Sequence, residues 1–190
     1  DIQLAALEAD FNRPLMIIAG PGAGKTHVLA GRVRKLIEQQ KDPNDWLVVI
    51  TYTNAAKKQL KDRLGFSADD NSNCFIGTVH QFAKFYIEQN SEHKRPIQVL
   101  DGYQAARKLS QIAGISFEES KKILDLVSQH KELSIDQYPH YQLLLDHMEY
   151  FNLATFHTLL TRALEIADNP DTFFPKYIVV DEYQDSGPAQ

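Results

Sequence analysis

The sequence predicts an α/β protein with a doubly wound parallel sheet and an α-helical insertion, and three observations support this class. Short, continuously apolar runs, typical of strands covered on both faces, occur between Pro14 and Ala19 and in LVVITY at 47–52. Each run is followed by a segment with apolar residues at helical spacing. From about Phe82 to Pro175 the sequence carries helical signals and almost nothing that resembles a buried strand. Alternating strands and helices favour a parallel sheet.

The elements of the sheet are expected in chain order. The run LMII predicts a first strand, and the helix after it shows one apolar face, formed by Leu29, Val33, Leu36 and Ile37. After the second strand, Asn54 is a candidate helix cap, ahead of a helix with Ala56, Leu60 and Leu64 on one side. Two further strands are expected at Cys74–Ile76 and Tyr177–Val180.

The insertion is expected to consist of capped helices. Two residue pairs have the spacing of a capping box ahead of amphipathic sequence, Asp101 with Gln104 and Ser116 with Glu119. A last helix is marked by the apolar positions Leu153, Phe156, Leu160, Ala163, Leu164 and Ala167. The tripeptide DNP at 168–170 should end it.

Composition limits the functional classes. The 190 residues, 43% hydrophobic and 24% charged, predict a folded core and at most two domains. A net charge of −5 argues against nucleic-acid binding through a general positive surface, so such contacts would need a local groove. The one cysteine, Cys74, excludes a disulfide framework and is best interpreted as a small buried residue of a strand. No leader and no apolar stretch near about 18 residues is present, which makes a cytoplasmic location the default expectation.

The stretch AGPGAGKT at 19–26 predicts a phosphate-binding loop. Gly20, Gly22 and Gly24 let the backbone approach closely, and the following helix directs unpaired N–H groups at an anion. Lys25 is placed for the β and γ phosphates of a nucleotide, and the Thr26 hydroxyl is a candidate magnesium ligand. The strict pattern GxxxxGK[ST] requires glycine where this chain has Ala19, whereas the expected strand before the loop and helix after it fit the pattern.

The stretch IVVDEYQD at 178–185 predicts the acidic half of the same site. Asp181 follows a buried strand at its carboxyl end, where ligands bind in open α/β sheets. It is therefore expected to hold magnesium, and Glu182 to orient or deprotonate the water that attacks the γ phosphate.

These motifs resemble those of the UvrD/Rep-like (PcrA-like) DNA helicases. The loop with alanine first is that family's own form, and TYTNAAKKQLKDRL at 51–64, GTVHQF at 77–82 and VDEYQD at 180–185 are similar to its other segments. The resemblance covers both ends of the chain and three internal motifs. It implies a RecA-like P-loop domain 1A, incomplete here, from residues 1–82 and 176–190, and a helical domain 1B from residues 83–175.

The resemblance also implies site residues. It assigns ATP binding to the loop, to its flanking residues and to the adenine-reading Gln3, namely Gln3, Ala19, Gly20, Pro21, Gly22, Ala23, Gly24, Lys25, Thr26 and His27. It assigns the binding of single-stranded DNA to residues that follow the second and third strands, namely Thr51, Tyr52, Thr53, Asn54, Thr78 and His80. It implies that Gln184 couples the two sites. Four cations on the helix after the second strand make that neighbourhood basic, namely Lys57, Lys58, Lys61 and Arg63. For each of them taken singly, the solvated face of an ordinary helix is the favoured explanation.

Three positions depart from the family pattern. Val79 replaces a common aromatic residue, which removes one possible stacking surface, and His27 stands where arginine is frequent. Ser186 lies in a changed segment but can still cap a helix.

For the whole protein the resemblance implies an ATP-dependent helicase that translocates 3′→5′ along single-stranded DNA and acts at junctions with duplex. Its second RecA-like domain, 2A, would contribute arginines worth about 10³–10⁵ in rate. The 190 residues alone are therefore expected to bind ATP–Mg²⁺ weakly and not to unwind DNA. Two other classes stay open: a P-loop kinase of small molecules, and a non-catalytic module whose DNA binding ATP regulates.

Overall fold

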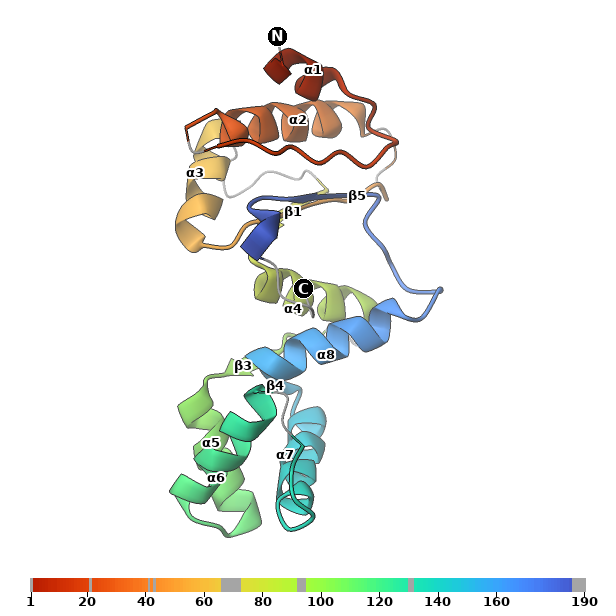
Figure 1. Cartoon of the computed structure of the whole chain (residues 1–190). Helices are drawn as coiled ribbons and strands as arrows, with labels where there is room; N and C mark the ends of the chain where they lie inside the picture. The colour runs from red at the N-terminus through yellow and green to blue at the C-terminus, as the bar shows by residue number, and fades with distance from the viewer. Residues whose placement is uncertain are drawn as a thin grey trace. The chain divides into compact units, whose positions relative to one another are not determined.

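The computed structural model describes residues 2–20, 22–40, 42, 44–65, 73–91, 95–129 and 132–185 (Figure 1). The chain divides into two compact units. The first unit contains Asp1–Phe82 with Phe173–Gln190, and the second contains Ala83–Thr172. The fold class predicted from the sequence is confirmed, because the described residues form a parallel sheet flanked by helices and a mainly helical insertion.

The first unit is built on a parallel sheet. Its strands within the described residues are β1 (Leu47–Ile50), β2 (Cys74–Gly77) and β5 (Tyr177–Val180), in the order β2-β1-β5. Leu47 is level with Cys74 on one side and with Tyr177 on the other. Since the strands are parallel and in step, their carboxyl ends lie together at one edge of the sheet. The strands expected to begin at Leu47, Cys74 and Tyr177 are thus confirmed.

Helices of the first unit begin at the carboxyl ends of these strands or pack on the sheet, except for α1, which packs on α2. They are α1 (Ile2–Glu8), α2 (Lys25–Gln39), α3 (Asn54–Leu64), the start of α4 (Val79–Asn90) and the short 3₁₀ helix η1 (Tyr183–Asp185). Val33 of α2 and Leu60 of α3 are buried against one face of the sheet together with Leu47 and Val49. Cys74 lies in β2, as expected, but it is only partly buried at the border of this cluster; burial raises the pKa of its thiol to about 12.

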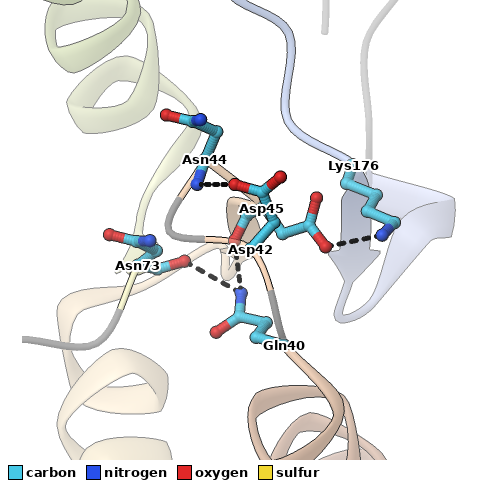
Figure 2. A network of polar contacts seen from close by, with 6 residues as sticks. All are labelled: Gln40, Asp42, Asn44, Asp45, Asn73 and Lys176. Atoms are coloured by element: carbon cyan, nitrogen blue, oxygen red, sulfur yellow. Dashed lines mark hydrogen bonds and ion pairs between the residues drawn. The ribbon is translucent and has the colours of Figure 1, made fainter.

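The amino ends of the strands are joined by a polar network (Figure 2). The side-chain amide of Gln40 donates to the carbonyl oxygens of Asp45 at 2.8 Å and of Asn73 at 3.2 Å. The carboxylate of Asp45 pairs with the ammonium of Lys176 at 2.5 Å, and the backbone N–H of Asn44 donates to Asp42 at 2.8 Å. These contacts connect the residues that precede β1, β2 and β5. The carboxyl ends of the strands lie at the opposite edge of the sheet.

The second unit is mainly helical. It contains the rest of α4, β3 (Gln98–Leu100), α5 (Gly102–Ala113), α6 (Phe117–Ser128), α7 (Tyr138–Tyr150), β4 (Leu153–Thr155) and α8 (Phe156–Ala167). The capping box of Asp101 with Gln104 is present, and Ser116 accepts from the backbone N–H of Glu119. The last helix ends at Ala167, directly before DNP, as the sequence predicts.

Several details differ from the sequence predictions. The insertion contains a short parallel ladder, β3 with β4, so Leu153 belongs to a strand and not to the last helix. Three residues per strand are too few for a readable alternation pattern. Asn54 is the first residue of α3, and Thr53 caps it by accepting from Ala56 N–H at 3.0 Å.

The expected first strand is absent from the described sheet. The run Leu15–Ile18 makes no ladder, and its side chains are 44, 69, 39 and 88% exposed. Contacts with α2 lie on both sides of this run. Arg32 stacks on the ring of Phe11 at 4.3 Å, and Lys25 donates to the carbonyl of Ala19 at 3.1 Å. The segment therefore follows α2, as Figure 1 shows, and does not enter the sheet.

Candidate functional site

The glycine loop leads directly into α2. Gly24 is the N-cap of the helix, with φ of 84°, and Gly22 has φ of 75°. Only glycine adopts this left-handed conformation at little cost, so these two positions explain part of the glycine content. Gly20 is not left-handed. The backbone N–H groups of His27 and Val28 donate to Gly24 at 2.9 and 3.1 Å, which closes the first turn. Pro21 lies outside the described residues.

Gln3 lies against this loop, although 20 positions separate it from Ala23. Its side-chain amide donates to the carbonyl oxygen of Ala23 at 3.1 Å. A Cβ atom added to Gly24 would lie 2.9 Å from the Gln3 Nε2 atom. Gly24 therefore serves two needs, a left-handed turn and space for the Gln3 amide.

The packing of α1 on α2 positions Gln3. A Cβ atom at Gly31 would lie 2.5 Å from a methyl group of Leu7, so α1 crosses α2 at this glycine. The guanidinium of Arg32 donates to the carbonyls of Ala6 at 2.6 Å and Ala9 at 3.1 Å, which satisfies the carboxyl end of α1. Gly31 was not among the predicted site residues, although an isolated glycine inside a helical pattern is a signal of close packing.

The loop and the acidic strand end meet at Lys25. The ammonium of Lys25 lies 3.8 Å from a carboxylate oxygen of Glu182 and also donates to Ala19. Glu182 accepts from the side-chain amide of Gln184 at 2.6 Å. Residues about 155 positions apart are thus brought together, as the two motifs require. Thr26, in the first turn of α2, is half-buried, whereas His27 and Ala23 are exposed.

Asp181 and Glu182 have different environments. Asp181 continues the sheet, since its backbone N–H donates to Ile50 at 2.9 Å, and its side chain is half-buried. Burial, and then the neighbouring Glu182 carboxylate, raise the pKa of Asp181, while Lys25 acts in the opposite direction. Glu182 is exposed and has φ of 50°, an uncommon conformation for a residue with a side chain. Such backbone outliers concentrate at functional sites.

Two further polar turns lie at the same edge of the sheet, after β1 and β2. Thr51 is fully buried, its backbone N–H continues the ladder to Gly77 at 2.9 Å, and its hydroxyl donates to Thr53 at 3.4 Å. Its side chain therefore supports the turn and does not face outward. Thr53 and Asn54 are exposed, while Tyr52 is half-buried.

Thr78 forms the turn after β2, and His80 lies in the first turn of α4; both are half-buried. Burial lowers the pKa of His80. Thr78 begins α4 through a reciprocal capping box with Gln81, with distances of 3.4 and 3.2 Å. Gln81 also contacts Lys57 and Asn54 and so joins the two turns. Gln81 was not among the predicted site residues, although threonine followed three positions later by glutamine is a capping-box signal.

The basic residues of α3 have separate environments. Lys57 is half-buried, and burial together with the nearby charge of Lys61 lowers its pKa. Lys58 and Arg63 are exposed, and the backbone carbonyl of Arg63 accepts from Arg34 at 3.1 Å. The four cations therefore do not form one uniform face.

A glycine loop at the start of a helix, facing acids at the end of a parallel strand, is the arrangement typical of P-loop nucleotide-binding proteins. Comparison with known proteins gives the family. The model for the UvrD/REP helicase N-terminal domain matches residues 1–190. The chain therefore belongs to the UvrD/REP helicase N-terminal domain family.

Individual relatives agree with this assignment. The chain is 30% identical over 215 aligned residues to the ATP-dependent DNA helicase PcrA of Bacillus subtilis, which covers 93% of the chain and 28% of that protein. It is 34% identical to a probable DNA helicase II homolog of Mycoplasma capricolum, over 49% of the chain and 13% of that protein. It is 42% identical to the ATP-dependent DNA helicase SRS2 of Saccharomyces cerevisiae, over 41% of the chain and 7% of that protein. The chain thus spans less than a third of these relatives. In the described part of the chain no helix has the length and apolar character needed to cross a membrane.

Proposed function

We propose that this chain is the nucleotide- and DNA-binding part of an ATP-dependent DNA helicase. The observation that carries the proposal is the 3.8 Å pair between Lys25 of the glycine loop and Glu182 after β5. It joins the two motifs that P-loop hydrolysis needs at one place. In this proposal the first unit is domain 1A and the second is the insertion domain 1B.

The proposed ATP site uses the loop from Ala19 to His27, with Gln3 beside it at the adenine. Loop N–H groups and the positive end of α2 attract phosphate oxygens. Lys25 exchanges its contact with Glu182 for the β and γ phosphates when ATP binds. Breaking that pair leaves the Glu182 carboxylate available for a water molecule.

Residues at this site also fit magnesium. Mg²⁺ prefers hard oxygen ligands, which the Thr26 hydroxyl and the Asp181 carboxylate supply. Burial and the adjacent Glu182 charge disfavour the ionised form of Asp181, so a bound cation would stabilise the carboxylate. When bound, the ion neutralises charge that develops on the phosphates.

Hydrolysis in this proposal follows from the positions of the two acids. Glu182 orients the attacking water and accepts its proton as the water oxygen bonds to the γ phosphorus. The bond from that phosphorus to the bridging oxygen breaks, and ADP leaves with the electron pair. Gln184, which donates to Glu182 at 2.6 Å, would transmit the state of this acid to the DNA side.

The proposed DNA surface is formed by the turns after β1 and β2. Asn54, Thr53 and Thr78 lie at the carboxyl ends of neighbouring strands, where they can contact phosphate or sugar oxygens. Tyr52 and His80 supply rings near the same turns, and base stacking on a ring contributes about 1–3 kcal/mol. We propose 3′→5′ movement along single-stranded DNA from the family resemblance, and we propose that the 190 residues do not unwind duplex without a second domain that closes on the nucleotide.

The proposal is tested by measuring ATP turnover of the full-length protein with and without single-stranded DNA. We expect DNA to stimulate turnover at least about tenfold, equal to about 1.4 kcal/mol of barrier. Turnover that DNA does not change would contradict the helicase and favour a P-loop kinase of small molecules. Absence of turnover with ATP binding retained would favour a non-catalytic module.

Replacing Gly24 with alanine should weaken ATP binding by about 5–30-fold. A left-handed residue with a Cβ costs about 1–2 kcal/mol, and the new methyl group would displace Gln3. Isothermal titration with a non-hydrolysable ATP analogue measures the effect. Gly65→Ala is the matched control, because Gly65 has φ of 74° and an added Cβ there meets nothing within 4 Å. Equal effects of both variants on ATP affinity would contradict a special role of the loop.

A further inference from the structure

Gln81 makes three contacts that connect the turn after β1 with the turn after β2. Its side-chain oxygen accepts from the Thr78 backbone N–H at 3.2 Å and from the Lys57 ammonium at 2.9 Å. Its side-chain nitrogen donates to Asn54 at 3.5 Å. One neutral amide thus holds residues of both turns. A Cβ atom added to Gly77 would lie 2.7 Å from the Phe75 ring and 3.0 Å from the Gln81 oxygen, so this glycine leaves room for both side chains.

The contact with Lys57 orients the ammonium without neutralising it. A carboxylate partner would cancel the charge, whereas an amide oxygen leaves it in full. Among the described residues no carboxylate lies within 4.0 Å of the Lys57 nitrogen. Lys57 is also half-buried, so it is less free to move than the exposed Lys58. An oriented, uncompensated cation at the carboxyl edge of the sheet suits a phosphate group.

We infer that Lys57 binds a phosphate of single-stranded DNA and that Gln81 is its positioning residue. This inference deepens the proposed function and rests on it, since the strand must pass over the turns after β1 and β2. Neither Lys57 nor Gln81 is among the DNA-binding residues that the motif resemblance implies. Gln81 acts by orienting Lys57 and by connecting the two turns, and it needs no contact with DNA itself.

Gln81→Glu separates this role from a structural one. Glutamate is equally good at the third position of a capping box, and an acid near the amino end of a helix is favourable. Glutamate cannot donate to Asn54 as the glutamine amide does at 3.5 Å, so a purely structural Gln81 predicts at most the loss of that contact, with an unchanged salt dependence of DNA affinity. A positioning residue predicts something different: the new carboxylate pairs with Lys57 and cancels its charge. DNA affinity then falls although the fold is retained.

The experiment measures binding of a fluorescein-labelled oligothymidine by anisotropy over a series of salt concentrations. For Gln81→Glu we expect affinity to fall about 5–10-fold and the slope of log affinity against log salt to decrease by about 0.7, the value for one phosphate of a single strand. Lys57→Gln should give the same two changes, and adding Gln81→Glu to it should change the slope no further. Gln59→Glu, which adds the same charge at an exposed position of α3, should change affinity less than about twofold with no loss of slope.

Each outcome is decisive. If Gln81→Glu and Gln59→Glu have equal effects, or if the salt slope of Gln81→Glu equals that of the wild type, the inference is overturned while the proposed function stands. If the wild type does not bind the oligothymidine, the proposed function fails, and this inference with it. Circular dichroism melts of each variant check that the fold is present.

Discussion

Glu182→Gln is expected to reduce ATP turnover by about 10²–10⁴-fold, the usual contribution of a general base. The amide keeps the size of the side chain and its place beside Gln184, but it cannot accept a proton. ATP affinity should stay equal or increase, because the 3.8 Å pair that holds Lys25 away from the nucleotide is lost. The measurement is steady-state phosphate release in the presence of single-stranded DNA, together with binding of a fluorescent ATP analogue.

The same substitution has an expected effect on pH dependence. The Glu182 charge raises the pKa of Asp181. With glutamine at 182 that pKa falls, so the acid limb of magnesium-dependent ATP binding should move to lower pH. Glu38→Gln, at an exposed position near the far end of α2, is the control and should change neither turnover nor the acid limb. Turnover of Glu182→Gln within about tenfold of the wild type would fall below the range for a general base and exclude this role.

Much of the first unit was predictable because its signals are local. Four consecutive apolar residues mark β1, and the acids directly after Val180 show where β5 ends. Parallel strands place their carboxyl ends at one edge, which explains why Glu182 lies on the same edge as the turns after β1 and β2. The meeting of Lys25 with Glu182 does not follow from this rule, because the run before the glycine loop does not enter the described sheet. The backbone conformation of Glu182 did not follow, since nothing in the sequence DEYQD requires a positive φ at its second residue.

The two errors about strands have a common physical origin, since sheet partners lie far apart in the sequence, whereas the cap of α3 was misplaced by one residue through a local contact. Leu15–Ile18 has the composition of a strand, yet it makes no ladder with the described strands. The ladder of β3 with β4 joins residues about 55 positions apart and is too short to leave a pattern. Local composition shows that a run is apolar but does not identify its partner.

Gln81 illustrates a different limit. Its capping-box spacing with Thr78 could be read from the sequence, and it predicts the start of α4 correctly. The contacts with Lys57 and Asn54 could not be read, because they depend on β1 and β2 being neighbours in the sheet. The sequence therefore shows the capping role of this residue and hides its role between the two turns.

Lys25→Met is expected to reduce kcat/KM for ATP by about 10²–10³-fold, the typical cost of removing one preorganised electrostatic contact. Methionine retains most of the aliphatic length and loses the ammonium that the phosphates need. Unlike Glu182→Gln, this variant should also bind ATP more weakly. The two effects together identify a contact made to the nucleotide before and during hydrolysis.

The expected pH effect of Lys25→Met is opposite in sign to that of Glu182→Gln. The Lys25 charge lowers the pKa of Asp181, against the raising effects of burial and Glu182. Without the ammonium that pKa rises, so protonation of Asp181 begins at higher pH and the acid limb of magnesium-dependent ATP binding moves upward. Lys35→Met is the matched control, because Lys35 lies ten residues further along α2, about 15 Å away. Acid limbs that move in the same direction in both site variants would show that Lys25, Asp181 and Glu182 do not share one electrostatic site.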